Sequence, residues 1–157
     1  MPVRQRMQSK GASIMSTSYL RDSRVWKVSF RNEEKAFLDK FAKDSGRSLR
    51  ELVDDAIHWA ITPWEPTKFP EFVLTAPGSQ RCSLRVDSKL FENFMGLLST
   101  TFDLSIGKHI NSASLIATVI WAYVEIHLDE ADADEFKSIT GSQMRVRLET
   151  ISLPIAS

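Results

Sequence analysis

Six polar residues recur at alternating positions in two short stretches of the chain. They are Lys27, Ser29, Arg31, Arg81, Ser83 and Arg85. In the major groove of DNA, arginine or lysine can donate hydrogen bonds to guanine O6 and N7, and serine can pair with donors or acceptors. These six residues are therefore candidates for reading DNA bases.

The residues between them are apolar. Trp26, Val28 and Phe30 occupy the alternate positions of the first stretch, and Cys82, Leu84 and Val86 those of the second. A period of two residues predicts a half-buried strand with one polar face. The first strand begins at Arg24.

The two stretches form an internal repeat. Residues 27–31 match residues 81–85 in the order cation, apolar residue, serine, apolar residue, arginine, at an offset of 54. An isolated strand is unstable because its backbone groups need a partner. We therefore expect the two strands to pair antiparallel, with their apolar faces hidden against helices and their cations exposed.

Each strand is followed by two predicted helices. Asn32 is the expected N-cap of the first helix, Gly46 ends it, and Ser48 with Glu51 forms a capping box for the second. After the second strand, Asp87 caps a helix, and residues 99–110 form a longer turn. The last of the four helices begins near Asn111 or Ser112 and ends near residue 128.

Backbone amides at helix starts attract phosphate groups, and cations near them strengthen that attraction. The candidate phosphate contacts near the ribbon and the two helix starts are Arg24, Arg47, Ser48, Arg50, Lys108, His109, Asn111 and Ser112.

At these residues the chain resembles the ribbon-helix-helix superfamily of Arc and MetJ-type repressors. The likeness is strongest over Val25–Ile61, including Gly46-Arg47-Ser48, and weaker over Gln80–Leu128 because of the longer turn. The resemblance implies a mostly α fold with a short β-ribbon. Two ribbon-helix-helix units in one chain would form a pseudo-twofold domain with an intramolecular antiparallel two-stranded ribbon. It also implies base contacts by the outward strand residues and phosphate contact at Ser48. The tandem form resembles conjugation accessory proteins that mark plasmid transfer origins.

Charge is distributed unevenly along a chain whose net charge is zero. Lysine and arginine exceed aspartate and glutamate by seven in residues 1–50, whereas acidic residues dominate the remainder. Such asymmetry favours an oriented molecule with one face for an anionic partner. The alternative is a basic tail that only aids solubility.

Five segments are expected from these patterns. They are a disordered basic arm (1–23), a first unit (24–61), a proline-rich linker (62–79), a second unit (80–128) and an acidic C-terminal extension (129–157). The predicted helix 113–126 is apolar nearly all round, which favours central burial with linker packing over the alternative, an oligomer contact.

Several chemistries have no support in the sequence. Cys82 is expected to be a buried small hydrophobe, and His58, His109 and His127 lack metal-ligand spacing. We predict no enzymatic activity, no cofactor and no metal. The longest apolar stretch is too short and too polar to span a bilayer, so we expect a cytoplasmic protein.

The sequence thus predicts sequence-specific binding of double-stranded DNA through a β-ribbon in the major groove. The role would be that of a transcriptional repressor or a plasmid-transfer, DNA-marking accessory protein. The protein would be a monomeric pseudo-dimer that could associate further on DNA, with no membrane partner. The alternative is an adaptor or antitoxin-like module whose terminal segments bind a protein partner.

Overall fold

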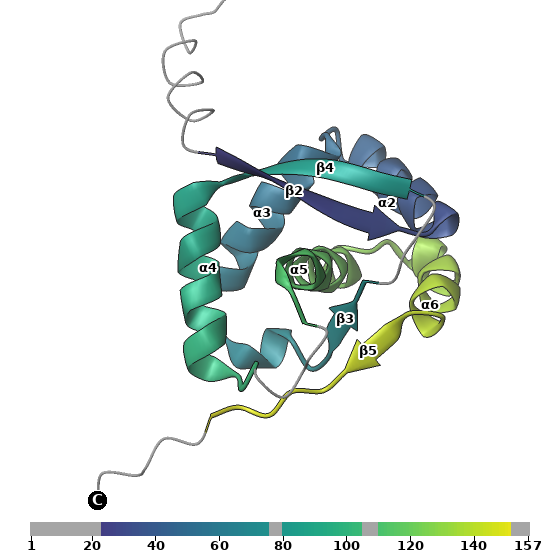
Figure 1. Cartoon of the computed structure of the whole chain (residues 1–157). Coiled ribbons are helices and arrows are strands. Elements are labelled where there is room, and N and C mark those ends of the chain that lie inside the picture. Colours follow the sequence, from purple (N-terminus) through teal and green to yellow (C-terminus); the bar gives the residue numbers. More distant parts are fainter. Residues whose placement is uncertain (1–22, 76–79, 105–109, 152–157) are drawn as a thin grey trace, which may run out of the picture.

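The computed structural model describes residues 23–75, 80–104 and 110–151 (Figure 1). Within these ranges, the chain forms short strands and helices. The elements are β2 (Ser23–Phe30), α2 (Asn32–Asp44), α3 (Leu49–Ile61), η1 (Pro66–Lys68), β3 (Phe72–Leu74), β4 (Gln80–Asp87), α4 (Ser88–Thr101), α5 (Ser112–Ile126), η2 (Glu130–Asp132), α6 (Ala133–Gly141) and β5 (Met144–Val146).

Strands β2 and β4 form an antiparallel ribbon that crosses one side of the molecule (Figure 1). Lys27 lies opposite Ser83, and this pair is flanked by Val25 opposite Arg85 and Ser29 opposite Arg81. The prediction that residues 27–31 and 81–85 lie on neighbouring strands of one ribbon is confirmed for residues 27–30, whereas Arg31 lies beyond the end of β2. Hereafter, the ribbon means the β2–β4 pair.

The predicted fold class, mostly α with one short ribbon and two ribbon-helix-helix units, is wrong. The described residues contain five α-helices and two separate two-stranded antiparallel sheets. In the second sheet, β3 pairs with β5, so that Phe72 lies opposite Val146 and Leu74 opposite Met144. The architecture is a mixture of helices and two small sheets. The second sheet was missed because its strands are only three residues long and lie far apart in the sequence.

Helix α5 occupies the centre of the molecule (Figure 1). Its residues from Ser114 to Trp121 are all buried, and Trp121 is only 1% exposed. The helix packs against α3, β2 and β3. The prediction of central burial with packing by the proline-rich segment is therefore confirmed. Because α5 is covered on several sides, it needs apolar residues nearly all round and not on one face alone.

The proline-rich segment joins the core through aromatic residues. Phe69 and Phe72 are buried, and Phe72 packs edge-on against Phe102 with ring centroids 5.0 Å apart. The peptide bond between Thr62 and Pro63 is cis. The backbone amide of Val73 donates to Thr118 Oγ1 of α5 at 2.8 Å, so a buried polar pair joins β3 to the central helix.

Residues 129–151, expected to be an acidic extension, also contribute to the core. Phe136 and Ile139 of α6 are buried, and the Phe136 ring lies 6.0 Å from that of Phe37. Leu148 is buried as well. The acidic residues 129–135 surround η2 and the start of α6, and Asp132 pairs with Lys40 at 3.3 Å.

The first helix begins one residue earlier than the expected cap indicated. Arg31 is the N-cap of α2, and its backbone amide donates to Glu34 Oε1 at 2.8 Å. Asn32 is the first helical residue, and its side chain accepts from Gln80 Nε2 at 3.0 Å. The N-cap of α4 is Asp87, so the caps of α2 and α4 are 56 positions apart. By their helix caps, the two repeats are therefore offset by 56 positions, whereas matching their residue types gave an offset of 54.

Candidate nucleic-acid interface

The outward face of the ribbon is formed by three cross-strand pairs. Val25, Lys27, Arg81 and Ser83 are exposed, and Ser29 and Arg85 are half-buried. The pairs are Val25–Arg85, Lys27–Ser83 and Ser29–Arg81. Opposing Cβ atoms in an antiparallel pair lie about 4.5–5.5 Å apart, so these six side chains form one small continuous surface. We call this surface the ribbon face.

The hydrophobic effect determines which face of the ribbon is turned outward. Val28 and Phe30 of β2 and Leu84 and Val86 of β4 are buried against the helices. Near the ribbon end, the Trp26 ring lies 4.9 Å from that of Phe91 in α4. Because side chains alternate along a strand, burial of these residues turns their neighbours to solvent. Reversing the ribbon would expose four apolar side chains.

The cations of the ribbon face differ in their partners. Among the described residues, Lys27 and Arg81 make no hydrogen bond or ion pair to a side chain. Arg85 Nη1 donates to Ser23 Oγ at 3.0 Å, which holds the guanidinium over the same end of the ribbon as Val25. Neither Arg81 nor Arg85 is neutralised by a described carboxylate, so the ribbon face keeps its positive charge.

Arg31, predicted to read bases, lies outside the ribbon face. Its guanidinium lies 3.5 Å from Glu34 Oε2 and 3.5 Å from Glu33 Oε1, and it donates to the Ile139 carbonyl at 3.4 Å. Its place at a helix cap, equivalent to that of Asp87, explains this orientation. The arginine therefore stabilises the junction of β2, α2 and α6.

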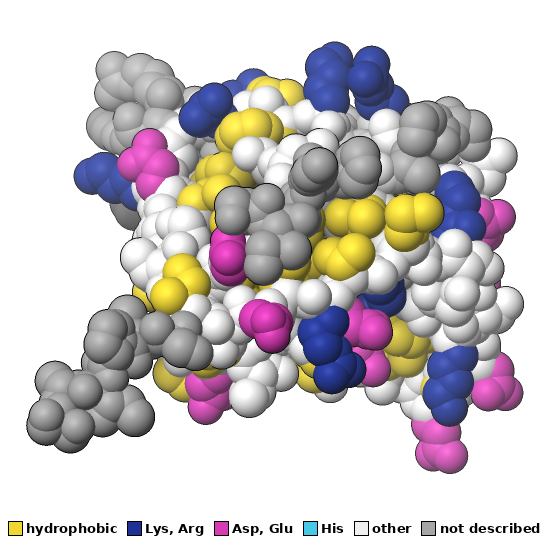
Figure 2. Space-filling model, turned by 60° about the horizontal axis from the view of Figure 1, so that its bottom comes forward, with side chains coloured by type: hydrophobic (Ala, Val, Ile, Leu, Met, Phe, Trp, Pro, Cys, Tyr) yellow, Lys and Arg dark blue, Asp and Glu magenta, His cyan; other side chains and the backbone are white. Residues whose placement is uncertain are grey.

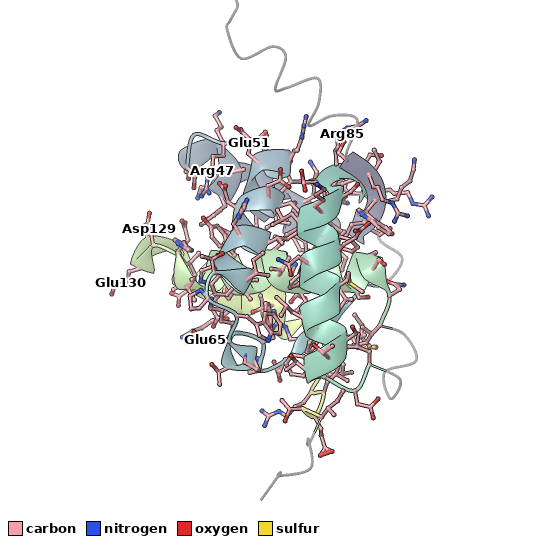
Figure 3. All side chains as sticks on the ribbon, turned by 90° about the vertical axis from the view of Figure 1, so that its left-hand side faces the viewer. Arg47, Glu51, Glu65, Arg85, Asp129 and Glu130 are labelled. Atoms are coloured by element: carbon pink, nitrogen blue, oxygen red, sulfur yellow. The ribbon has the colours of Figure 1, made fainter. Side chains whose placement is uncertain are left out.

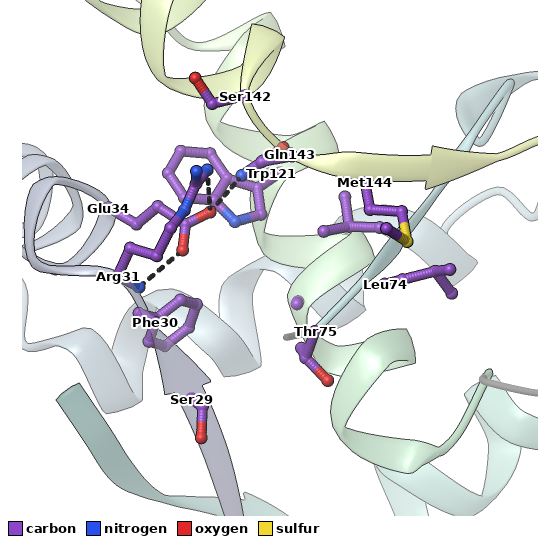
Figure 4. Close-up of a pocket in the computed structure, with 12 residues that line it drawn as sticks. Ser29, Phe30, Arg31, Glu34, Leu74, Thr75, Trp121, Ser142, Gln143 and Met144 are labelled. Carbon is purple, nitrogen blue, oxygen red and sulfur yellow. Dashed lines mark hydrogen bonds and ion pairs between the residues drawn. The ribbon is translucent and has the colours of Figure 1, made fainter. Parts of the chain in front are cut away.

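A cavity of about 160 Å³ adjoins this junction. Figure 4 shows Arg31, Glu34 and Gln143 at one end, where Gln143 Nε2 donates to Glu34 Oε2 at 2.8 Å. Trp121, Leu74 and Met144 supply apolar walls. The polar groups at this end satisfy one another, and these hydrogen bonds accommodate the buried Glu34 carboxylate.

The predicted phosphate contacts near α3 have different surroundings. Ser48 caps α3, where its Oγ accepts from the Glu51 amide at 3.1 Å and its own amide donates to Glu51 at 2.9 Å. Arg47 instead is bound to Asp55 Oδ2 and Tyr123 Oη. The hydrogen bond to Tyr123, followed by that to Asp55, raises the pKa of the Arg47 guanidinium. Arg47 therefore braces α3 against α5.

The remaining predicted phosphate contacts lie at the ribbon end and at two helix starts. Arg24 is exposed, with its guanidinium 4.7 Å from the centre of the Trp26 ring. Arg50 lies in the first turn of α3. Asn111 caps α5 by accepting from the Ser114 amide at 2.9 Å, and Ser112 is the first residue of that helix. Lys108 and His109 lie outside the described residues.

Two ribbon residues were missed by the sequence reasoning. Val25 lies on the ribbon face, and Gln80 is exposed at the opposite end of the ribbon. Continuing the alternation from Lys27 back to residue 25 could have placed Val25 on this face. Val25 was missed because only polar residue types were considered as candidates.

Charged side chains of both signs occur near the ribbon and away from it. Figure 3 shows Arg85 near the ribbon end and Arg47 and Glu51 at the same upper level, with Asp129, Glu130 and Glu65 lower. The face that carries β3 and β5 instead has hydrophobic side chains at its centre and mixed charges below (Figure 2). The two sides of the molecule therefore present different chemistry to a partner.

Other kinds of site find no support in the described ranges. No group of three or more His, Cys, Asp and Glu side chains could hold a metal ion there. Cys82 is a half-buried free thiol whose pKa is raised by burial. No described helix combines the length and apolar character needed to cross a bilayer. Comparisons with protein-family models, curated proteins and solved structures found no match.

Proposed function

We propose that the protein binds double-stranded DNA in a sequence-specific manner by inserting the ribbon into the major groove. The observation that carries this proposal is the ribbon face itself. Three cations and two serines lie side by side on a two-stranded ribbon, and no described carboxylate pairs with Lys27, Arg81 or Arg85. Packing alone gives no reason for so many polar donors on one small surface.

A two-stranded ribbon is an element that the major groove accepts. The major groove of B-DNA is about 12 Å wide and admits a two-stranded β-ribbon. In that position Arg81 and Arg85 are the candidates for two hydrogen bonds each to guanine O6 and N7. Lys27 and Ser83, at the middle pair, would contact the bases between them, and Ser29 would lie beside Arg81.

Groups around the ribbon support the proposal by offering contacts to the DNA backbone. Helix α3 packs against β4, and the ribbon end carries the exposed Arg24. The first amides of a helix point out of its start and attract phosphate. The α3 start at Ser48 stays a predicted phosphate contact, but its capping box already occupies the Ser48 and Glu51 amides. Phosphate contacts of this kind orient a protein on DNA without reading sequence.

A single chain supplies both strands of the ribbon, so one molecule would be enough to occupy the groove. Further association on DNA, a role as repressor or plasmid-transfer accessory protein, and a cytoplasmic location follow from the proposal and stay predictions. The ends of the ribbon differ in sequence, so the preferred DNA site should differ between its two halves.

The test is selection of bound fragments from a pool of random duplex DNA by the purified protein. We expect a short enriched motif that contains guanine, and an affinity that falls with salt by roughly one power for each phosphate neutralised. Arg81→Ala and Arg85→Ala should each weaken binding to that motif by about 1–3 kcal/mol. Lys137→Ala, an exposed cation of α6, is the matched control and should bind like the unaltered protein.

Two results would count against the proposal. One is recovery of no motif together with salt-independent binding. The other is unchanged affinity in the doubly substituted Arg81→Ala, Arg85→Ala protein. Either would favour the adaptor hypothesis, in which a terminal segment binds a protein partner. For residues 129–151, that hypothesis has to accommodate the packing of Phe136, Ile139 and Leu148 in the core.

A further inference from the structure

One apolar side chain lies among the polar residues of the ribbon face. Val25 is 46% exposed and lies opposite Arg85. A single exposed valine is ordinary on a protein surface. This one, however, lies on the surface proposed to enter the groove, on the same side as Lys27 and Ser29, where a hydrogen-bonding residue would be expected.

The base edges in the major groove offer one apolar group, the C5 methyl of thymine. A 5-methylcytosine carries the same methyl at the same ring position. A branched aliphatic side chain gains free energy by removing such a methyl from water, whereas it leaves the donors and acceptors of other base edges unpaired.

The position of Arg85 indicates where the methyl group would lie. Arg85 faces Val25 across the ribbon, and its bond to Ser23 keeps the guanidinium at this end. A guanine bound by Arg85 and a base touched by Val25 would therefore be near neighbours. At the opposite end, Arg81 faces Ser29, which can donate or accept a hydrogen bond.

We propose that Val25 contacts the methyl group of a 5-methylpyrimidine, adjacent to the guanine read by Arg85, and so distinguishes the two halves of the DNA site. This inference rests on the proposed function. The Val25 half-site prefers thymine or 5-methylcytosine at one position, and the Ser29 half-site has no such methyl preference.

The experiment uses the full chain and the duplex obtained by selection, in which each thymine is replaced singly by deoxyuridine. Affinity is measured by fluorescence anisotropy at fixed salt. We expect one replacement to weaken binding by about fourfold, the effect of about one buried methyl group. Val25→Ala should bind the thymine duplex more weakly and should no longer respond to that replacement.

A second arm separates the two sources of the methyl group. At the sensitive position, cytosine and 5-methylcytosine, each paired with guanine, replace the thymine–adenine pair. Tighter binding of the methylated duplex by the unaltered protein, lost in Val25→Ala, shows that either base can supply the methyl. Equal binding of the two cytosine duplexes, with the deoxyuridine effect intact, assigns the contact to thymine.

The matched control is Ser29→Ala, which should keep the deoxyuridine effect at the Val25 position. Val25→Thr retains the branched shape and replaces one methyl by a hydroxyl, so it should show a smaller effect than the unaltered protein. A deoxyuridine effect that persists in Val25→Ala, or its absence in the unaltered protein, overturns the inference. The broader proposal fails in a different way, by loss of all selective binding to duplex DNA.

Discussion

The described residues form two small sheets of the same kind, and these sheets differ in what their polar groups contact. In the ribbon, Lys27 and Arg81 have no described side-chain partner and face solvent. In the β3–β5 sheet, Arg145 donates to Gln143 Oε1 at 2.6 Å and lies 3.8 Å from Glu71, while Val73 is tied to Thr118.

This difference separates a surface for a partner from a part of the scaffold. In the β3–β5 sheet, Val73 and Arg145 bond to neighbouring parts of the protein, and Phe72 and Val73 lie in the core. The ribbon buries Val28, Phe30, Leu84 and Val86 on one face, and on its other face Lys27 and Arg81 have no described side-chain partner. The location of unpaired cations therefore distinguishes the two sheets better than their backbone geometry does.

The largest expected effect concerns the scaffold sheet. Phe72→Ala should lower the free energy of unfolding by about 3–5 kcal/mol, because it removes a fully buried ring that packs against Phe69 and Phe102. Urea unfolding measures this change, with the exposed Thr67→Ala as control. The folded fraction should bind DNA with unaltered affinity. A change of less than about 1 kcal/mol in the free energy of unfolding is the size expected of a surface substitution, and it would show that β3 is not part of the core.

A smaller effect should follow from removing the hydroxyl that joins β3 to α5. Thr118→Val leaves the buried Val73 amide without its acceptor, so we expect a loss of about 1–3 kcal/mol in unfolding free energy. Hydrogen exchange of the Val73 amide provides the direct measurement and should accelerate. Persistence of slow exchange there would contradict the assigned bond.

The ribbon should respond in the opposite way. Arg85→Ala should weaken binding to the selected duplex by about 1–3 kcal/mol and relax base preference at one position, while thermal unfolding changes little. Anisotropy titration against single-base variants of the duplex measures both quantities. Arg145→Ala, in the scaffold sheet, serves as the comparison and should affect stability more than affinity. A larger loss of DNA affinity in Arg145→Ala than in Arg85→Ala would contradict the roles assigned to the two sheets.

The smallest expected effect on DNA affinity concerns Arg31, which lies just beyond the ribbon face. Arg31→Ala should leave DNA affinity within about twofold, since the guanidinium is turned toward Glu33, Glu34 and the Ile139 carbonyl. Its ion pair with Glu33 is exposed, and the buried Glu34 carboxylate keeps its bonds from the Arg31 amide and Gln143 Nε2, so the loss of stability should stay near about 1 kcal/mol. The same titration measures the affinity. A loss as large as that of Arg85→Ala would mean that Arg31 turns outward on DNA.

The features that could be predicted from the sequence follow from strong local patterns. Alternation around Val28 and Leu84 predicted both strands of the ribbon and their pairing. The nearly continuous apolar surface around Trp121 predicted a central helix. In each case the hydrophobic effect acts on many consecutive residues, so the pattern is visible without knowledge of the partners.

The features that could not be predicted depend on contacts between distant segments. Strand β3 lies among prolines, and its pairing with β5 joins residues seventy or more positions apart. Arg31 shares its residue type with Arg85, but its conformation is set by Glu34 and by the carbonyl of Ile139. Matching residue types therefore paired Arg31 with Arg85, whereas the helix caps pair Arg31 with Asp87, two positions further on.

The most direct test of the account is a proton–nitrogen correlation spectrum of the isotope-labelled protein, recorded during titration with the selected duplex. The account predicts that the largest amide shifts fall on residues 25–29 and 81–85, with smaller changes at the start of α3 and little change in β3 and β5. Shifts concentrated on α6 and β5, with the ribbon amides unmoved, would contradict it.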